Sequence, residues 1–181
     1  GAANYRKVAT PITINGSTTG VTYVSTKGEH TCAIQNTGVW CWGYNNYGQV
    51  GNGLTTPTTV ATPTQPVNTA LGVSFASGFV QSETDESGVG SSCFVKNNGA
   101  VYCVGYAQNN SIGFTGNTST PKPTTDWTSG ITQIRMSNGY SCALTGSTMT
   151  LGCVGSNVGN FGNGTSQAAL STPVTLSALT G

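Results

Sequence analysis

The sequence predicts an all-β fold of three repeats, each built from short antiparallel strands with a hairpin closed by a disulfide. Three observations predict it. A stretch with two cysteines occurs three times, and the six cysteines fall at two equivalent positions of that stretch. The composition, rich in glycine, threonine, serine and asparagine, favours strands and turns over helices.

The repeated stretch starts at His30, Ser91 and Tyr140. It reads HTCAIQNTGVWCWGYNNYGQVGNG in the first copy, SSCFVKNNGAVYCVGYAQNNSIGFTG in the second and YSCALTGSTMTLGCVGSNVGNFGNG in the third. Each copy has a first cysteine in an apolar strand, a turn of small residues, a second strand with the second cysteine, and a glycine two residues later. A period of roughly 50 residues predicts that each unit buries its apolar face on its neighbours.

The segments before these stretches also align, since strand-like sequences start at Gly20, Gly72 and Gly130. ATPITINGSTTG near the N-terminus resembles the closing STPVTLSALTG, so we interpret the N-terminal segment as the end of a preceding repeat. The predicted organisation is a surplus strand segment in residues 1–19, repeat 1 in 20–71, repeat 2 with an acidic insertion in 72–129, and repeat 3 in 130–181.

The cysteine pairs face each other if every stretch folds as a hairpin. Turns at Asn36-Thr37, at Asn97-Asn98-Gly99 and around Ser147-Thr148 set the two cysteines of each copy opposite one another. Cα atoms of a non-hydrogen-bonded antiparallel pair lie about 4.5 Å apart, within disulfide range. The predicted disulfides are Cys32–Cys41, Cys93–Cys103 and Cys142–Cys153. Zinc ligands and redox pairs are more closely spaced, and reduced core cysteines are the alternative.

Alternation along the second strand of each hairpin assigns side chains to two faces. Val39 and Cys41 share one face, and Trp40 and Trp42 share the other. Positions after the second cysteine hold Trp42, Val104 and Val154, which we expect to pack against a neighbouring sheet. Trp40 and Tyr102 precede that cysteine, and their variable position is compatible with a contact surface, although core packing also accounts for them.

Charge excludes two classes of partner. Charged residues make up 6% of the chain and the net charge is +1. The chain therefore lacks the basic surface of a nucleic-acid-binding protein and the clusters that attract anionic lipid. No apolar run reaches the ~20 residues that span a bilayer, so no membrane insertion is predicted. Six cysteines in a chain of low charge indicate an oxidising compartment, and we predict an extracellular or cell-surface location.

The stretch from His30 to Gly53, with Thr-Pro downstream, resembles the repeat of the regulator of chromosome condensation family. The first copy matches the family's Cys-Ala-Leu, Trp-Gly and Gly-Gln steps closely, the third matches moderately and the second weakly, with Ser91 and Tyr140 in place of His30. The resemblance implies a β-propeller of four-stranded blades. Many secreted bacterial relatives carry this cysteine pair, and that subset is the better match. Nothing implies that the exchange-factor surface of the nuclear members is present.

Three blades are too few for a closed standard propeller, which has four to eight. The chain is therefore expected to be part of a longer parent chain, to form an open arc, or to be completed by other copies. The surplus strand, with Val8, Ile12 and Ile14 as its apolar residues, favours completion by another copy, because an unpaired strand seeks a sheet edge. Such donation would be head-to-tail.

No catalytic, cofactor-binding or metal-binding motif is present in the sequence. His30 is the only histidine and occupies the position of the family's repeat histidine, so a structural role is expected. Glu83, Asp85 and Glu86 cluster in the insertion of repeat 2 and, with Trp40 and Tyr102, are the candidate partner contacts. We predict no cofactor and no enzymatic activity.

The sequence favours one function and leaves two alternatives. The favoured hypothesis is a non-catalytic extracellular structural or adhesive subunit of a cell-surface assembly, such as a filament, a pilus-like structure or an adhesin. Its partners would be further copies, with a cell-surface or glycan ligand as a further candidate. The first alternative is a soluble partner-binding module, an inhibitor or lectin-like fragment of a longer propeller. A carboxylate-dependent hydrolase is the remaining alternative.

Overall fold

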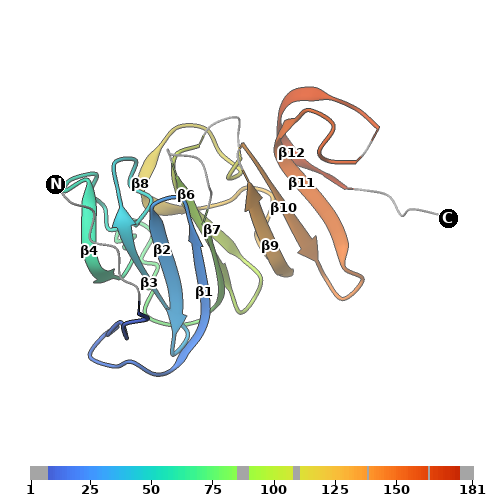
Figure 1. Ribbon diagram of the computed structural model, residues 1–181. Helices are drawn as coiled ribbons and strands as arrows, with labels where there is room; N and C mark the ends of the chain where they lie inside the picture. Colours follow the sequence, from blue (N-terminus) through green and yellow to red (C-terminus); the bar gives the residue numbers. More distant parts are fainter. Residues whose placement is uncertain (1–7, 85–89, 108–110, 138, 163, 176–181) are drawn as a thin grey trace.

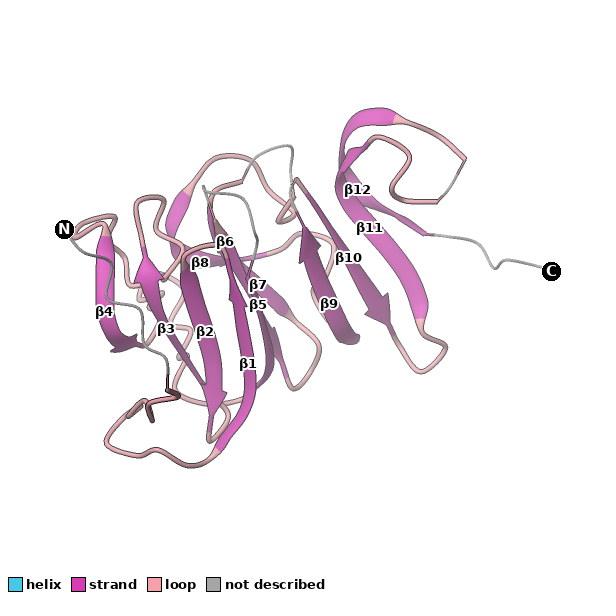
Figure 2. Cartoon of the chain, in the orientation of Figure 1, coloured by secondary structure: helices cyan, strands magenta, loops and turns pink. Residues whose placement is uncertain are grey.

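The computed structural model describes residues 8–84, 90–107, 111–137, 139–162 and 164–175. Within these residues the chain forms twelve strands in three antiparallel four-stranded sheets (Figures 1 and 2). The sheets stand side by side as an open arc, the first at the left of Figure 1 and the third at the right. The predicted fold class is confirmed, including a disulfide across each hairpin and a blade number too low for a closed propeller.

The first sheet consists of β1 (Val21–Lys27), β2 (His30–Gln35), β3 (Gly38–Tyr44) and β4 (Thr59–Thr64), in that order. Its central hairpin turns at Asn36 and Thr37, as predicted. Both residues have positive φ, 49° and 65°, which a two-residue type I′ turn requires. The resulting register places Cys32 opposite Cys41.

The second sheet consists of β5 (Phe79–Thr84), β6 (Ser91–Lys96), β7 (Val101–Gly105) and β8 (Thr118–Pro123). Its hairpin has the predicted three-residue turn, closed by a hydrogen bond from Lys96 N–H to Ala100 O at 2.9 Å. Gly99 ends the turn at φ 79°, a conformation that glycine adopts without a steric cost. Cys93 therefore lies opposite Cys103.

The third sheet consists of β9 (Ile131–Ser137), β10 (Tyr140–Thr145), β11 (Thr150–Asn157) and β12 (Gln167–Thr175). Thr145 pairs with Thr150, so the turn of four residues is centred where the sequence predicts it. Cys142 pairs with Cys153. In all three disulfides the Cα atoms are 4.1 Å apart, close to the distance expected for a non-hydrogen-bonded pair.

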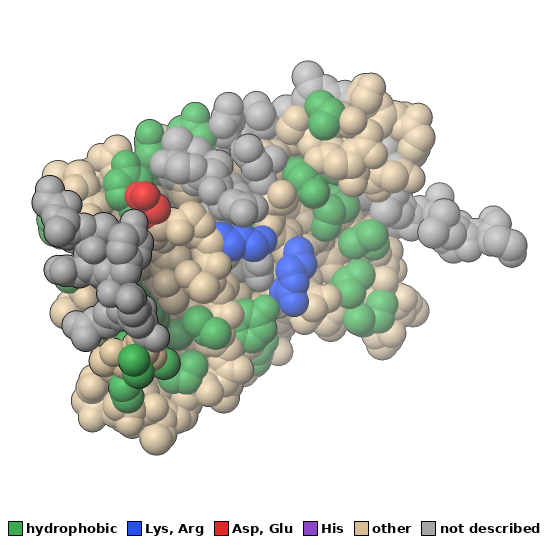
Figure 3. All heavy atoms as spheres, viewed as in Figure 1, with side chains coloured by type: hydrophobic (Ala, Val, Ile, Leu, Met, Phe, Trp, Pro, Cys, Tyr) green, Lys and Arg blue, Asp and Glu red, His purple; other side chains and the backbone are tan. Residues whose placement is uncertain are grey.

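The first strands of the three sheets, β1, β5 and β9, are edge strands that lie beside one another. Ser25 on β1 and Ser82 on β5 share a hydrogen bond of 3.2 Å between their hydroxyl groups. From β1, Lys27 reaches further and donates to Met136 O on β9 at 2.8 Å. Figure 3 shows the basic side chains of this view gathered near the middle of the molecule, where these strands meet. The apolar core lies between the sheets, in two clusters.

The N-terminal segment forms no strand in residues 8–13. Val8 is 78% exposed and Ile12 is 52% exposed, whereas Ile14 is buried within the chain and pairs through its backbone with Ser17. Because Ile14 is already covered by its own molecule, strand donation remains a prediction that concerns Val8 and Ile12.

Candidate functional site

Each hairpin has two faces. The cysteine face carries the disulfide and two further side chains. One lies two positions after the first cysteine and the other lies two positions before the second. These pairs are Ile34 and Val39 in the first sheet, Val95 and Val101 in the second, and Leu144 and Leu151 in the third. The opposite face carries the residues on either side of each cysteine. Val39 and Cys41 share the cysteine face, as alternation predicts, and are fully buried, whereas Trp40 and Trp42 on the opposite face are half-buried.

At the first junction, the cysteine face of the first sheet packs on the opposite face of the second sheet. Ile34 and Val39 are completely buried in one cluster with Phe94 and Val104. Phe75, from the connection between the two sheets, belongs to the same cluster. The packing that we expect of Val104 is therefore present.

At the second junction, the cysteine face of the second sheet packs on the opposite face of the third sheet. Val95 and Val101 are buried in one cluster with Ile134, Ala143 and Val154. The two junctions thus follow one rule: a cysteine face always contacts the opposite face of the next sheet.

Polar contacts across the second junction fix how the sheets align. The side-chain amide of Gln81 on β5 donates to Ile134 O on β9 at 2.6 Å, and Ile134 N–H donates to Gln81 Oε1 at 3.1 Å. Both backbone groups lie on the edge strand of the third sheet, where no neighbouring strand pairs with them. The Gln81 amide therefore makes the two hydrogen bonds that a neighbouring strand would otherwise make with the Ile134 backbone.

The hairpin turns also bond to the next sheet. Thr37 O accepts a hydrogen bond from Phe79 N–H at 2.9 Å at the first junction, and Gly99 O accepts one from Ile131 N–H at 3.2 Å at the second. Phe79 and Ile131 are the first residues of β5 and β9. Each turn therefore holds the start of the following sheet.

The cysteine face of the third sheet has no sheet against it among the described residues. Leu144 and Leu151 are half-buried there, although their equivalents in the other two sheets are fully buried. Met149, in the hairpin turn, is 52% exposed. A hollow of about 170 Å³ is lined by Gln133, Arg135, Cys142, Ala143, Leu144 and Leu151. In Figure 3, hydrophobic side chains lie over the third sheet, at the right of the view.

The opposite face of the first sheet likewise has no sheet against it among the described residues. Trp40 and Trp42 are half-buried, and Val24, which pairs with Ala33, is 59% exposed. Ile134, the equivalent of Val24 in the third sheet, is completely buried at the second junction. Among the described residues the arc therefore leaves one cysteine face and one opposite face without a sheet against it. We call these the open faces and take them as the candidate functional site.

The structure places the contact residues predicted from the sequence in different parts of the molecule. Trp40 lies on the open opposite face, whereas Tyr102 lies at the first junction with its ring centre 5.9 Å from that of Phe75. The backbone of Glu83 pairs with Cys93 in the second sheet. Asp85 and Glu86 lie outside the described residues.

Other residues of the open faces, among them Val24, Gln133, Leu144 and Leu151, were not among the sequence-predicted contacts. The signal that could have found them is their equivalence, position by position, to residues that are buried between sheets elsewhere in the chain.

His30 is buried at the first junction. Its Nε2 lies 2.9 Å from Ser92 Oγ, and that hydroxyl group donates to Gln49 O at 2.8 Å. Burial lowers the pKa of His30 to about 4, although a backbone hydrogen bond with Ser91 acts in the other direction. The neutral ring is therefore a polar member of the core and is not exposed to solvent.

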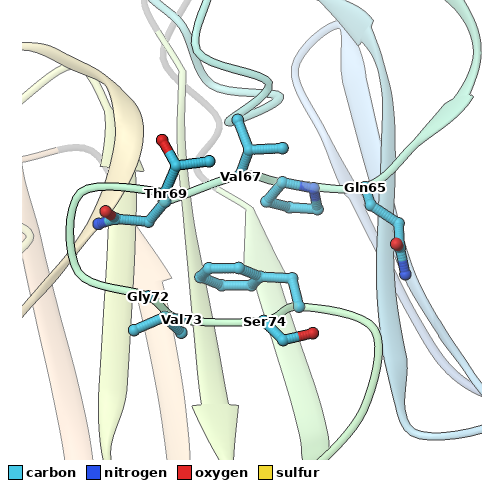
Figure 4. Close-up of a pocket in the computed structure, with 9 residues that line it drawn as sticks. Gln65, Val67, Thr69, Gly72, Val73 and Ser74 are labelled. Carbon is cyan, nitrogen blue, oxygen red and sulfur yellow. The ribbon is translucent and has the colours of Figure 1, made fainter.

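The connection between the first two sheets contains a cavity of about 330 Å³. Figure 4 shows residues 65–69 and 72–75 running past one another around it. The two stretches are joined by a backbone bridge between Asn68 and Val73. No lining residue has an ionisable side chain, so the cavity offers no acid or base for catalysis.

No group of three or more histidine, cysteine, aspartate or glutamate side chains is placed to hold a metal ion in the part of the chain that the structure describes. Nor do the described residues form a helix long and apolar enough to cross a membrane.

Comparison with known proteins identifies the repeat. Two family profiles for the regulator of chromosome condensation (RCC1) repeat match residues 21–49 and 38–78. Residues 21–78 therefore match the RCC1 repeat. No curated protein matches the chain at a significant level.

Solved structures agree with the RCC1-type fold. Human WBSCR16 matches with a TM-score of 0.71 at 20% sequence identity, over 93% of this chain and 42% of that one. Prp20p from Saccharomyces cerevisiae, whose structure was described together with its binding to Gsp1p and histones, matches with a TM-score of 0.66 at 14% identity, over 88% of this chain and 39% of that one. The chain thus spans about two fifths of the length of these two relatives.

Proposed function

We propose that this RCC1-type chain is a non-catalytic protein-interaction module that serves as an extracellular structural or adhesive subunit, binding protein partners through its two open sheet faces. One observation carries the proposal. The faces left open at the two ends of the arc are of the same two kinds whose apolar side chains pack together at both internal junctions.

The extracellular part of the proposal is supported by the cysteines. The six cysteines of the chain form three disulfides, one in each central hairpin, and such bonds persist in oxidising compartments. The low charge of the chain suits a partner that is a protein surface rather than nucleic acid. Prp20p, a relative in fold, is likewise described by its protein partners.

The non-catalytic part is supported by the position of the chain's one histidine. His30 is 3% exposed and hydrogen-bonded to Ser92 within the core, so it is not placed to exchange protons with a substrate in solvent. The RCC1-repeat fold serves mostly in binding rather than in chemistry, and this chain fits that use.

Light scattering of the oxidised protein over a range of concentrations, with negative-stain images of the same sample, tests the structural role. A mass that rises with concentration, together with rings or filaments in the images, is the expected result. A constant monomer mass would contradict a self-assembling structural subunit and favour the soluble partner-binding module.

The location is tested separately in the native host. Intact cells are treated with a membrane-impermeant protease, and the unreduced protein is analysed by peptide mass spectrometry. We expect the protein to be degraded without cell lysis and its peptides to be linked in the three hairpin pairs. Protection until lysis, or free thiols, would contradict an extracellular location.

A further inference from the structure

We infer that a second copy of this chain docks the opposite face of its first sheet onto the cysteine face of the third sheet, forming a third junction of the kind already present twice inside the molecule. The inference rests on the proposed function and names the partner. It follows from the equivalence of positions between the three sheets.

The first step concerns the apolar side chains. At the internal junctions, the positions of Leu144 and Leu151 hold Ile34 and Val39 or Val95 and Val101, all at most 1% exposed. These side chains are covered by the opposite face of the next sheet.

On the first sheet, the opposite face offers Val24, Trp40 and Trp42. These large side chains would cover Leu144 and Leu151 of another copy and remove both apolar surfaces from water.

The second step concerns the polar contact at the edge strand. Gln133 faces Leu144 in the third sheet as Gln81 faces Val95 in the second. The amide of Gln133 has no hydrogen-bond partner among the described residues. Gln81 bonds to both backbone groups of Ile134, and the equivalent of Ile134 in the first sheet is Val24. The Gln133 amide is therefore placed to bond to the Val24 backbone of the second copy.

The third step concerns the hairpin turn. At both internal junctions the turn accepts a hydrogen bond from the first residue of the next sheet. The turn of the third sheet, residues 146–149, has no following sheet among the described residues, and Met149 in it is 52% exposed. Val21 is the first residue of β1 and is 45% exposed. Its N–H would complete the same contact from another copy.

The two faces of this contact are different, so the association is heterologous. Each copy has one face of each kind, and a head-to-tail contact closes into a ring or continues into a filament. In such a ring, several copies would together supply the blades that a single longer chain supplies in a closed propeller.

Two face variants test the inference with the full chain. Leu151→Arg damages the cysteine face of the third sheet and leaves the first sheet intact. Val24→Arg damages the opposite face of the first sheet and leaves the third intact. Leu71→Arg is the matched control, because Leu71 is 55% exposed in a connection away from both faces. Circular dichroism and unreduced peptide mapping show that every variant has folded.

We expect Leu151→Arg and Val24→Arg each to be monomeric by light scattering, and Leu71→Arg to assemble like the wild type. An equimolar mixture of the two face variants is expected to give a heterodimer of twice the monomer mass, because one intact junction remains possible between them. A mixture that stays monomeric would overturn the inference. So would a Val24→Arg protein that still forms dimers, since this would show a symmetric contact.

Failure of the inference can be told apart from failure of the proposed function. A wild-type assembly that neither face variant weakens would leave the structural role in place and move the contact elsewhere, for example to the N-terminal segment. A wild type that stays monomeric at all concentrations would contradict both. Gln133→Ala gives a finer test when it is added to the Val24→Arg variant, whose third sheet is intact. We expect the dissociation constant of the heterodimer with Leu151→Arg to rise roughly tenfold. No change would exclude the Gln133 contact.

Discussion

At the scale of the residue, His30 shows how a buried polar group links stability to pH. The unfolded chain binds a proton at the ordinary histidine pKa of about 6.5, whereas burial holds the pKa of the folded chain at about 4. Between these values the unfolded state binds more protons than the folded state. The free energy of unfolding is therefore unaffected by His30 above pH 6.5 and should fall by about 3 kcal/mol as the pH drops to about 4.

Urea unfolding at several pH values measures this loss. His30→Gln is the control, because its side chain can still reach Ser92 but does not titrate. The difference in unfolding free energy between the two proteins should change with pH only in this window. A constant difference would show that the ring is protonated in the folded state as readily as in the unfolded one.

Gly99 occupies a turn that is packed tightly on the next sheet. A Cβ atom there would lie 2.3 Å from the backbone nitrogens of Gly130 and Ile131. We expect Gly99→Ala to lower the free energy of unfolding by more than about 2 kcal/mol. Gly116→Ala is the matched control, since Gly116 has the same φ of 79° but open space around it, and should cost about 1 kcal/mol. Equal losses would show that the close approach to the third sheet is unimportant.

At the scale of the element, each hairpin is held by a disulfide that closes a short loop. We expect replacing Cys142 and Cys153 by alanine to lower the free energy of unfolding by about 2–3 kcal/mol. Replacing Cys32 and Cys41 should cost more, because both are completely buried at the first junction and their loss also opens a cavity. Thermal unfolding of the two double variants measures the order. A larger loss in the third hairpin would contradict the burial argument.

The N-terminal segment gives the next prediction. Gln35 donates to Ser17 O and Thr19 O, and Ile14 is buried, so residues 14–19 belong to the first sheet's own packing. A truncation of residues 1–13 should leave stability within about 0.5 kcal/mol. If the exposed part of the segment is donated to a neighbour, the truncation should weaken assembly. Unchanged mass in light scattering would remove Val8 and Ile12 from the contact.

The hairpins could be predicted from the sequence because their signals are local. Asn36-Thr37 and Gly99 specify turn lengths, and turn length together with alternation specifies which residues oppose one another. The packing of Tyr102 against Phe75 and the bond from Gln81 to β9 could not be predicted, because both depend on segments distant in the sequence. For Trp42 the prediction is met only at equivalent positions. A neighbouring sheet covers its equivalents Val104 and Val154, as expected, but no sheet covers Trp42 itself among the described residues.

At the scale of the whole molecule, the repeat explains why the two end faces match. Each internal junction needs one face of each kind, so any number of stacked sheets in an open arc leaves one cysteine face and one opposite face unused. A longer propeller uses this pair to close its own ring. In the three described sheets no further sheet covers this pair, and in the assembly we propose it contacts another copy.

This chemistry predicts how assembly responds to salt. The open faces are mostly apolar, with Leu144 and Leu151 on one and Val24, Trp40 and Trp42 on the other. Arg135, which also lines the hollow of the third sheet, already donates to the Tyr23 hydroxyl group and to Ile134 O within the chain. Burial of the apolar groups does not depend on screened charges. Between about 0.05 and 0.5 M sodium chloride, we expect the dissociation constant measured by light scattering to change less than about threefold. Assembly that weakens steeply with salt would instead indicate ion pairs, and would direct attention to the acidic residues Glu83, Asp85 and Glu86.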